Sequence, residues 1–490
     1  MNTQETRTRF APNPTGYMHI GNLRTALYAY LFAKHDNGKF ILRIEDTDQK
    51  RFVDGAIELI YRTLKQTGLK HDEGPDIGGD FGPYVQSERK PIYKEYALKL
   101  VELGHAYYCF CKNDESDEHE SDAEQAPSFG YNRHCRNLSK EEIEKRLAEG
   151  QSYVIRQKIP LDGTTTFHDE VYGDITVENN SLDDQILLKS DGVPTYNFAN
   201  VVDDYLMKIT HVVRGKEYVS STPKYQLLYD AFGWESPKTV HLSTIMGQNA
   251  DGSISKLSKR HGSVSFANLI EQDGYLTEAI LNYIALLGWS PRAEREVYTL
   301  DELVQIFDLE GIVKTNAIFD YKKLDWFNSI YINQMTHEQF VEYSKPFIVN
   351  LPDFLKEKWE FASTLAQSRI SKFSEICSMF EFLSNYTDFD LALFENKKNK
   401  LDKASSLQIL EEMLPLLQNE QAWTVESLSE LIQNYTTQKE YKIGKTMWPL
   451  RIGVTGATVT PGGGAEMLYL LGKAESLTRI NKCIERLKNN

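Results

Sequence analysis

The sequence predicts an α/β fold in its first part and an all-α fold in its second part. A strand, helix, strand, helix order over residues 8–68 marks the start of a doubly wound sheet. From residue 276 onward, apolar residues recur at helical spacing and no strand alternation competes with them. The length of 490 residues is enough for about three or four domains.

The first strand and helix are predicted to meet at a turn that suits an anion. Thr8–Ala11 is the expected strand, prolines and a glycine then force a turn, and helical spacing begins at Leu23 with Asn22 as the expected N-cap. His19 and Gly21 therefore lie near a helix start, where backbone N–H groups and the helix dipole favour negative charge. His19 can also donate to a phosphate oxygen. The alternative is an ordinary tight turn with a surface histidine.

The second predicted strand ends in polar groups. Phe40–Ile44 is nearly all apolar, which is typical of a strand buried on both faces of a parallel sheet. Glu45–Asp48 follow it at the carboxyl end, where open α/β sheets bind ligands. Helical spacing resumes at Phe52 and stops at Gly68.

A basic segment far downstream complements the first turn. Lys256–Arg260, with the sequence KLSKR, alone predicts a solvated basic loop. Together with His19 and Gly21 it forms the second half of a clamp around a triphosphate, which is typical of adenylate-forming chemistry. Gly444–Thr446 looks like the end of a Walker phosphate loop, but Lys439 stands where the first glycine should be. We therefore predict an ordinary loop there.

Composition limits the partners and the compartment. The net charge of −15 argues against a general polyanion binder but allows a local basic face. The acidic stretch Lys112–Pro127 is expected to be a solvated loop. The first residues lack a signal-peptide core, and no apolar run approaches the ~20 residues of a membrane span; Ile280–Trp289 is expected to be a core helix. Five cysteines do not make a disulfide scaffold, so we expect a cytoplasmic protein with no membrane association.

The second half has the pattern of a helical domain. A buried helix is predicted at Leu276–Gly288, and amphipathic stretches follow at Leu300–Phe307, Gln339–Phe347, Arg369–Leu383, Ser406–Leu417 and Ser427–Asn434. Basic and aromatic residues punctuate this region, including Arg369, Lys372, Lys442, Lys445, Trp448 and Arg451. From the pattern alone, ordinary surface charge and core aromatics explain them better than RNA stacking does.

Several motifs share one order and spacing with a known family. They are Arg9–Gly16, His19–Asn22, Arg43–Asp48, Gln86–Arg89, Leu188–Tyr196, Asn200–Asp204, Arg214–Glu217, Lys256–Arg260 and Gly444–Arg451 with Thr455–Gly456. Together they resemble the motifs of bacterial glutamyl-tRNA synthetases, which are class I aminoacyl-tRNA synthetases. The resemblance runs from Arg7 to near the carboxyl terminus.

The resemblance implies a domain order and an activity. The expected Rossmann-like catalytic domain comprises residues 1–107 and 188–250 and is split by an insertion at 108–187. A stem-contact domain with the KLSKR loop is expected at 251–325, and an all-helical anticodon-binding domain at 326–490. The implied reaction is ATP-dependent ligation of L-glutamate to the 3′ end of glutamate tRNA through a glutamyl-adenylate, with Mg²⁺ accompanying ATP. We expect a monomer.

The resemblance also implies roles for individual residues. His19, Lys256 and Lys259 would be catalytic, and His19, Gly21 and Lys259 would bind ATP. The residues that would bind glutamate are Arg9, Asn13, Glu45, Tyr196, Asn200, Arg214 and Glu217. Among them, Arg9, Tyr196 and Arg214 would hold the side-chain carboxylate and Glu45 the α-ammonium group. A planar guanidinium matches a planar carboxylate, and the neutral amide of glutamine would leave a buried arginine unpaired.

Two positions depart from the family pattern. Asn13 stands where serine is usual, and both side chains can donate to a carboxylate, so we expect only a local adjustment. Asn22 replaces the last histidine of the general class I motif, at a position that varies within the family.

Three cysteines in the expected insertion suggest a metal site. Zinc takes four ligands and favours thiolates. Cys109, Cys111 and Cys135 would supply three of them, and some family members carry a structural zinc ion at the matching positions. Tyr131 is the expected fourth ligand, and His134 is an alternative. The competing interpretation is three free cysteines in a metal-free insertion.

Four other functions compete with this one. A glutaminyl-tRNA synthetase would carry a β-barrel anticodon domain, and a tRNA-modifying relative would lack the helical carboxyl-terminal half. A small nucleotidyltransferase would not need 490 residues. An inactive RNA-binding paralogue would not need His19, Lys259 and Arg214. Arg369 lies where the family discriminates anticodons and favours an enzyme restricted to glutamate tRNA.

Overall fold

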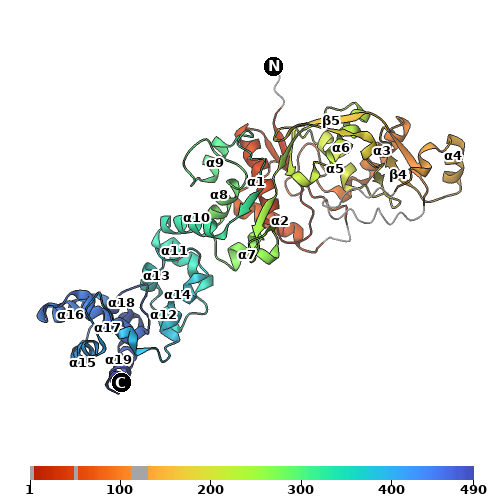
Figure 1. The fold of residues 1–490 in the computed structure, drawn as a ribbon. Coiled ribbons are helices and arrows are strands. Elements are labelled where there is room, and N and C mark those ends of the chain that lie inside the picture. Colours follow the sequence, from red (N-terminus) through yellow and green to blue (C-terminus); the bar gives the residue numbers. More distant parts are fainter. Residues whose placement is uncertain (1–4, 49–52, 112–130, 490) are drawn as a thin grey trace. The chain divides into compact units, whose positions relative to one another are not determined.

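The computed structural model describes residues 5–48, 53–111 and 131–489, with Lys259 described by its backbone. The chain divides into two units (Figure 1). Unit 1 comprises Met1–Ile270 and Thr277–Leu324, and unit 2 comprises Glu271–Leu276 and Asp325–Asn490. The predicted acidic loop Lys112–Pro127 and the predicted helix start at Phe52 lie outside the described residues.

Unit 1 is built on parallel strands, as predicted. β1 (Arg7–Phe10) pairs in parallel with β2 (Lys39–Leu42), and α1 (Ile20–His35) connects them. β8 (His211–Gly215) pairs in parallel with β9 (Lys238–Leu242). β1 lies beside β8, because the Thr210 N–H donates to the Arg7 carbonyl at 2.9 Å. The carboxyl ends of β1, β2 and β8 therefore meet at one edge.

The region predicted as an insertion contributes to two sheets. β3 (Ala106–Cys109), β4 (Val154–Gln157) and β7 (Ile186–Leu188) form an antiparallel sheet, flanked by α4 (Lys140–Ala148). β5 (Thr164–Asp169) and β6 (Gly173–Glu178) form a hairpin that instead extends the β8–β9 sheet. The junction is a parallel pairing of Asp169 with Thr239. Residues on both sides of position 187 thus belong to one sheet.

The first helix begins earlier than the sequence predicted. α1 starts at Ile20, and its N-cap is His19 rather than Asn22. The reason is that the His19 Nδ1 atom accepts a hydrogen bond from the Gly21 N–H at 3.0 Å. The ring nitrogen therefore caps the helix in place of the side-chain oxygen of Asn22. α2 (Ala56–Thr67) ends as predicted at Gly68, whose φ of 71° is left-handed.

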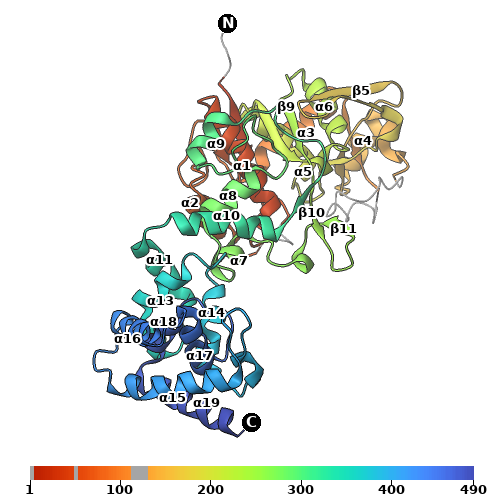
Figure 2. The ribbon, with the colours of Figure 1, turned by 60° about the vertical axis from the view of Figure 1, so that its left-hand side comes forward.

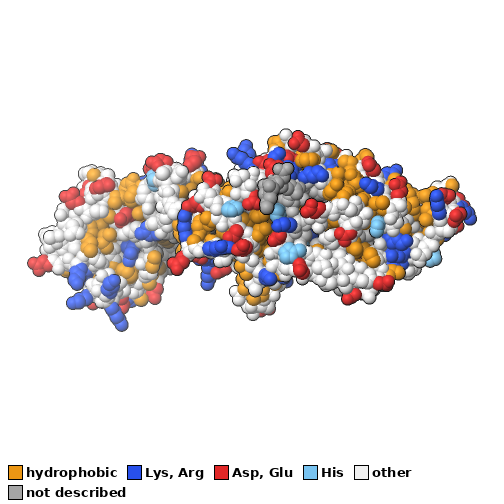
Figure 3. All heavy atoms as spheres, turned by 90° about the horizontal axis from the view of Figure 1, so that it is seen from above, with side chains coloured by type: hydrophobic (Ala, Val, Ile, Leu, Met, Phe, Trp, Pro, Cys, Tyr) orange, Lys and Arg blue, Asp and Glu red, His pale blue; other side chains and the backbone are white. Residues whose placement is uncertain are grey.

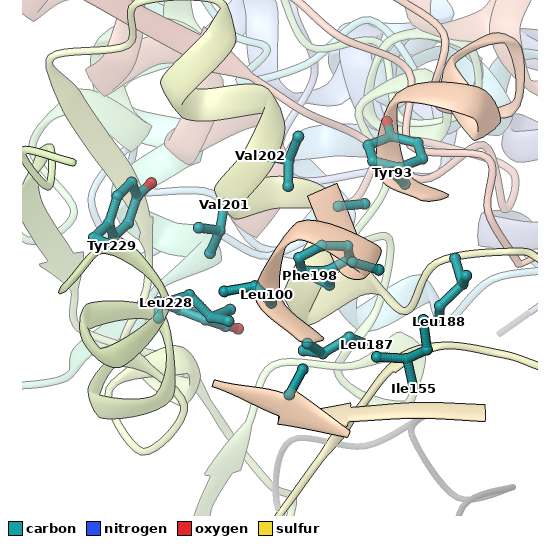
Figure 4. Close-up of a cluster of buried hydrophobic side chains, with 14 residues drawn as sticks. Tyr93, Leu100, Ile155, Leu187, Leu188, Phe198, Val201, Val202, Leu228 and Tyr229 are labelled. Atoms are coloured by element: carbon teal, nitrogen blue, oxygen red, sulfur yellow. The ribbon is translucent and has the colours of Figure 1, made fainter. Parts of the chain in front are cut away.

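A buried apolar cluster fixes the helix that borders the strand edge (Figure 4). α5 (Tyr196–Leu206) packs Phe198, Val201 and Val202 into this cluster, and α3 (Lys90–Glu102) and α6 (Thr222–Phe232) supply its other helical side chains. The next positions along α5, Asp203 and Asp204, are also buried. Apolar packing on one side of α5 therefore holds Asp204 against Arg9 of β1 and Arg43 next to β2, and it holds Asp203 against Arg89.

The KLSKR segment belongs to a small three-stranded sheet. β10 (Ile245–Gln248) pairs with β11 (Ile254–Lys256) as a hairpin (Figure 2). β10 also pairs in parallel with β12 (Ala317–Phe319). η6 (Lys259–His261) and α7 (Phe266–Glu271) follow β11. β12 lies in the region predicted to be all helical, and that prediction was wrong there. A strand of three residues is too short to show alternation.

The remaining helices of unit 1 are α8 (Thr277–Ala285) and α9 (Leu300–Ile306). α9 confirms the predicted stretch Leu300–Phe307. The helix predicted over Leu276–Gly288, and over Ile280–Trp289, ends at Ala285 instead, because Gly288 has a φ of 99° and Trp289 forms a bridge with Ile312.

Unit 2 is helical. α10 (Tyr321–Gln334) runs into it, and its further helices are α11 (His337–Ser344), α12 (Asp353–Lys356), α13 (Trp359–Ala366), α14 (Glu375–Ser384), α15 (Lys403–Asn419), α16 (Val425–Gln438), α17 (Ile443–Thr455), α18 (Gly464–Leu471) and α19 (Lys473–Lys488). Capping boxes begin α11, α15 and α16. Within the described part of unit 2, strand pairing is limited to one isolated bridge between Asn396 and Leu401.

Two predictions in unit 2 were wrong. Gly444–Thr446 is not a loop but the first turn of α17, where Thr446 is buried and Thr436 donates to it at 2.9 Å. The helix predicted from Arg369 begins only at Glu375, whose carboxylate accepts from the Ser371 N–H at 2.7 Å.

None of the described helices is long and apolar enough to cross a membrane.

Candidate active site

The carboxyl ends of β1 and β2 carry an interlocked set of charges, which we call the Arg9 cluster (Arg9, Arg43, Glu45 and Asp204). Arg9 donates from Nε and Nη2 to the two carboxylate oxygens of Asp204 at 3.1 and 3.3 Å. Arg43 donates from Nη1 to Asp204 at 2.7 Å and from Nη2 to Glu45 at 2.8 Å. All four side chains are buried. Two cations and two anions therefore compensate each other inside the protein.

Burial and charge act in opposite directions on the two acids of the Arg9 cluster. Burial raises the pKa of Asp204, but Arg9 and Arg43 outweigh it and the pKa ends below its usual value. Burial also raises the pKa of Glu45, and there it prevails over Arg43 and Arg9. Among the described residues, only Oε1 of Glu45 receives hydrogen bonds, from Arg43 and Gln86. A ligand ammonium group at Oε2 would stabilise the ionised form.

A second buried arginine at this edge has different partners, in what we call the Arg214 row (Asp169, His241, Arg214 and Thr222). Arg214 donates from Nε to His241 Nε2 at 3.1 Å and from Nη2 to Thr222 Oγ1 at 2.9 Å. Its guanidinium also lies over the rings of Tyr225 and Tyr218, at 4.8 and 5.4 Å. Arg214 is 6% exposed, and within the described residues no carboxylate touches it. Its charge is therefore held by neutral groups alone.

A cavity of about 230 Å³ reaches Arg214. Its wall is formed by α5, α6 and strands β5, β8 and β9, and includes Arg214, Asn200, Tyr225 and Tyr229. Arg9, Glu45 and Tyr196 do not line it. The cavity thus borders part of the predicted glutamate-binding set.

The His19 turn and the KLSKR segment, far apart in sequence, lie together. The Ile20 N–H donates to the Val264 carbonyl at 2.9 Å, and the Phe266 N–H donates to the Met18 carbonyl at 3.0 Å. Burial lowers the pKa of His19, the backbone at Leu257 opposes this by hydrogen bonding, and Lys256 lowers it further. His19 is therefore a neutral imidazole at pH 7, and because Nδ1 accepts from Gly21, its proton is on Nε2.

His261 holds the KLSKR segment in place by hydrogen bonds, and this role was not predicted from the sequence. Its Nδ1 accepts from the Ser258 N–H at 3.0 Å, and its Nε2 lies 2.9 Å from the Asn249 side-chain oxygen. The ring packs on Gly247, where a Cβ would come within 2.7 Å of it. The sequence feature that could have indicated this role is the position of His261 between Arg260 and Gly262.

The structure brings most of the predicted glutamate set to one edge. Asn200 donates to the Tyr196 carbonyl at 2.7 Å, and the Tyr196 ring lies 5.4 Å from that of Tyr218. The Glu217 carboxylate folds back over Gly215, where a Cβ would meet it at 2.2 Å. Asn13, by contrast, is exposed.

Three sulfur atoms converge in the region predicted as an insertion. The Sγ atoms of Cys109, Cys111 and Cys135 all lie within 4.8 Å of one another. The Tyr131 hydroxyl is 3.1 Å from Cys109 Sγ, whereas His134 is exposed on η3 (His134–Asn137). Burial opposes ionisation of Cys109, but hydrogen bonds from Tyr131 and the Cys111 backbone lower its pKa below the usual thiol value. Three thiolates could supply three of the four ligands of a zinc ion, and the Tyr131 phenol lies beside them.

Comparison with known proteins identifies the class. A family model described as "tRNA synthetases class I (E and Q), catalytic domain" matches residues 5–326, and one described as "Anticodon binding domain" matches residues 339–484. These ranges confirm the predicted fold class. The chain belongs to the class I tRNA synthetases.

Individual relatives narrow this further. Glutamate–tRNA ligases of Clostridium novyi and Clostridium botulinum are 52% and 54% identical to it, over 100% and 99% of this chain and 99% of each relative. A crystal structure of a glutamate tRNA ligase from Elizabethkingia meningosepticum in complex with its amino acid has a TM-score of 0.83 and 36% identity, covering 99% of this chain and all of that one. The chain is a member of the glutamate–tRNA ligase family, which confirms the resemblance seen in its motifs.

Proposed function

We infer that the chain catalyses ATP-dependent ligation of L-glutamate to the 3′ end of glutamate tRNA. Relatives with this name share 52–54% identity with almost the whole chain. The observation that carries the amino-acid assignment is Arg214, a buried guanidinium whose partners in the described structure are neutral. A buried cation of this kind is stabilised when an anionic ligand pairs with it. The side-chain carboxylate of glutamate is such a ligand.

We propose that the strand edge holds glutamate between the Arg9 cluster and the Arg214 row. Arg214 pairs with the side-chain carboxylate through the N–H groups that His241 and Thr222 do not use. Glu45 takes the α-ammonium group at Oε2. Tyr196, Asn200 and Glu217 complete the pocket. Arg9 can add at most one N–H from each Nη, because Asp204 and the Val213 carbonyl occupy the others. Asn13 joins only if its exposed turn moves inward.

In the first step, an oxygen of the α-carboxylate attacks the α-phosphorus of ATP. A carboxylate O–P bond forms, and the P–O bond to pyrophosphate breaks. The α-carboxylate is already ionised, so the protein needs no strong base; it must align the reactants and neutralise charge on the departing pyrophosphate. We propose the side chains of His19, Lys256 and Lys259 and the backbone at Gly21 for that task, and Mg²⁺ accompanies ATP.

In the second step, a terminal ribose hydroxyl of the tRNA attacks the glutamyl carbonyl and AMP leaves. Figure 3 shows basic and acidic side chains interspersed on one face of the molecule, so a net charge of −15 does not prevent local contact with RNA. We propose that unit 2 binds the anticodon, with Arg369 as a contributor. We also propose that the enzyme acts as a monomer in the cytoplasm, since its five free cysteines fit a reducing compartment.

We further propose that Cys109, Cys111, Cys135 and Tyr131 hold a structural zinc ion. The support is the close approach of the three sulfur atoms and the phenol. Protein prepared without chelators should contain about one zinc per chain, and Cys109→Ser should lose it and melt earlier. Zinc-free protein of unchanged stability would contradict the site.

An ATP–pyrophosphate exchange assay tests the main proposal. With glutamate, exchange should occur and its dependence on added glutamate tRNA should be measured; glutamine should support little exchange, because its neutral amide cannot pair with Arg214. Charging of glutamate tRNA and of glutamine tRNA is then compared. If glutamine supported exchange as well as glutamate does, the chain would belong with the glutamine-specific members of the class I synthetases (E and Q).

A further inference from the structure

Arg214 is held by a row of side chains that reaches across three strands. Arg214 in β8 and His241 in β9 are register partners, and Asp169 ends the neighbouring strand β5. The His241 Nδ1 lies 2.6 Å from Asp169 Oδ2, and the His241 Nε2 lies 3.1 Å from Arg214 Nε. Asp169 and His241 are completely buried. Sequence motifs singled out neither of them.

We propose that Asp169 and His241 are positioning residues that hold Arg214 for the substrate carboxylate and thereby set the preference for glutamate over glutamine. This inference rests on the proposed function of Arg214. It adds two residues that do not touch the substrate, one of which comes from the region predicted as the insertion.

The hydrogen bonds allow only one tautomer of His241. A guanidinium has only donors, so His241 Nε2 must accept, and the single proton of a neutral imidazole is then on Nδ1. Asp169 accepts that proton's hydrogen bond at Oδ2. Its Oδ1 accepts from the backbone N–H groups of Val171 and Tyr172 at 3.0 and 2.9 Å. Because backbone donors hold Asp169 rigidly, the ring and then the guanidinium have one defined orientation.

A neutral ring between the two charges suits a ligand-binding arginine. Burial lowers the pKa of His241, the Asp169 hydrogen bond raises it and Arg214 lowers it, leaving the imidazole neutral at pH 7. A carboxylate placed directly on Arg214 would already satisfy the cation, as Asp204 does for Arg9. In the Arg214 row, the His241 ring lies between Asp169 and Arg214. Asp169 therefore fixes the orientation of the guanidinium without touching it. The substrate carboxylate is then the first anion that Arg214 touches.

The competing interpretation is a purely structural pair that joins β5 to β9. Such a pair would affect stability but would not single out one substrate. Thr165→Val is a matched control, since Thr165 lies in the same strand and its hydroxyl donates to Asn179 in a buried site without touching Arg214. It should lower stability without changing the Michaelis constants.

The experiment measures ATP–pyrophosphate exchange by the full chain with glutamate and glutamine. His241→Phe removes the acceptor for Arg214, and Asp169→Asn turns an amide toward His241, favouring the tautomer that points Nε2–H at Arg214. Each should raise the KM for glutamate about 10-fold, the scale of one hydrogen bond to a charged group, with the KM for ATP changing less than about 2-fold. The preference for glutamate over glutamine should fall by a similar factor. His241→Gln, which retains an acceptor near the Nε2 position, should recover part of it.

The double variant with Arg214→Ala separates the possible failures. If His241 acts through Arg214, then His241→Phe should have little further effect on the glutamate KM in the Arg214→Ala background. An equal effect in both backgrounds would overturn the inference. So would an unchanged glutamate KM in folded Asp169→Asn and His241→Phe proteins while Arg214→Ala still impairs glutamate binding; in that case the role of Arg214 stands. An unchanged KM in Arg214→Ala itself would instead remove the proposed role of Arg214.

Discussion

Neighbouring strands β1 and β8 each send a buried arginine toward one edge, and the two side chains have opposite electrostatic settings. Arg9 of β1 is paired with the carboxylate of Asp204, which also pairs with Arg43. Arg214 of β8 is held by an imidazole and a hydroxyl. The same residue type at the same sheet edge can therefore serve the fold in one strand and a ligand in the next.

The charge of the partner explains the difference. A buried ion pair keeps its charges compensated within the protein, so a ligand carboxylate gains little by approaching it. A buried cation among neutral groups retains its attraction for an anion. Arg7, also in β1, follows the first pattern, because it forms a bidentate pair with Glu73 at 2.7 and 2.9 Å. The arginines of β1 are thus paired within the protein, and the arginine of β8 is the one that we propose binds the substrate carboxylate.

The largest expected effect comes from removing the shared acid of the Arg9 cluster. Asp204→Ala leaves Arg9 and Arg43 without their common partner, and breaking a buried pair costs about 3–5 kcal/mol. The urea midpoint of unit 1 should fall sharply. Asp174→Ala, at an exposed carboxylate, is the control and should leave unfolding nearly unchanged. A stability loss below about 1 kcal/mol for Asp204→Ala would remove the distinction between the two strands.

The next effect should fall on the chemical step rather than on recognition. Lys259→Ala should slow glutamyl-adenylate formation by about 10²–10³, because one preorganised contact to the leaving pyrophosphate is lost. The KM for glutamate and the affinity for tRNA should change little, and transfer from preformed adenylate should slow less. Single-turnover measurements separate the steps, with the exposed Lys65→Ala as control. Equal slowing of both steps would make the loop an RNA-facing surface.

Recognition itself should depend on Arg214. Hydrogen bonds to a charged group contribute about 1.5–3 kcal/mol, so Arg214→Ala should raise the KM for glutamate roughly 10- to 150-fold. The KM for ATP should stay nearly constant, and unit 1 should lose much less stability than in Asp204→Ala. Initial-rate kinetics and a urea curve on the same preparations test both statements. A variant that unfolds like Asp204→Ala would place Arg214 with the arginines of β1.

The sequence was sufficient for the parts of the molecule that follow local rules. The spacing of apolar residues predicted α1, α2, α9, α11, α15 and α16, and the run Phe40–Ile44 predicted β2. Motif resemblance predicted which segments meet at the strand edge. Errors arose where a local signal was absent or misleading: β12 has three residues, and Gly444 looked like a loop glycine although it lies within α17.

The partners of the arginines were not predictable from the sequence. Arg9 and Arg214 received the same predicted role, and only tertiary contacts distinguish Asp204 from His241 as their neighbours. Asp169 lies 45 positions before Arg214 on a strand assigned to another domain. A single histidine in HLS or aspartate in FHD carries no periodic or spacing signal, so its role emerges only from the register of β5, β8 and β9.

The smallest expected effect concerns the pH dependence of folding stability, which tests whether the arginines of β1 are structural. The Glu73 carboxylate is buried, but hydrogen bonds from Arg7, Tyr84 and Lys39 outweigh burial and lower its pKa to about 2. Its pKa in the unfolded chain is about 4.3. Folding therefore gains stability from the ionised group above about pH 4.5, and that gain is lost as the pH falls toward 2.

Glu73→Gln should lower the free energy of unfolding at pH 6 by about 1–2 kcal/mol and flatten the decline of that free energy between pH 4.5 and 3. Urea midpoints at pH 6, 4.5 and 3 provide the measurement, with the exposed Glu58→Gln as the matched control. If Glu73→Gln and Glu58→Gln showed the same pH profile, the Arg7–Glu73 pair would not hold β1 in place, and the comparison between β1 and β8 would rest on Asp204 alone.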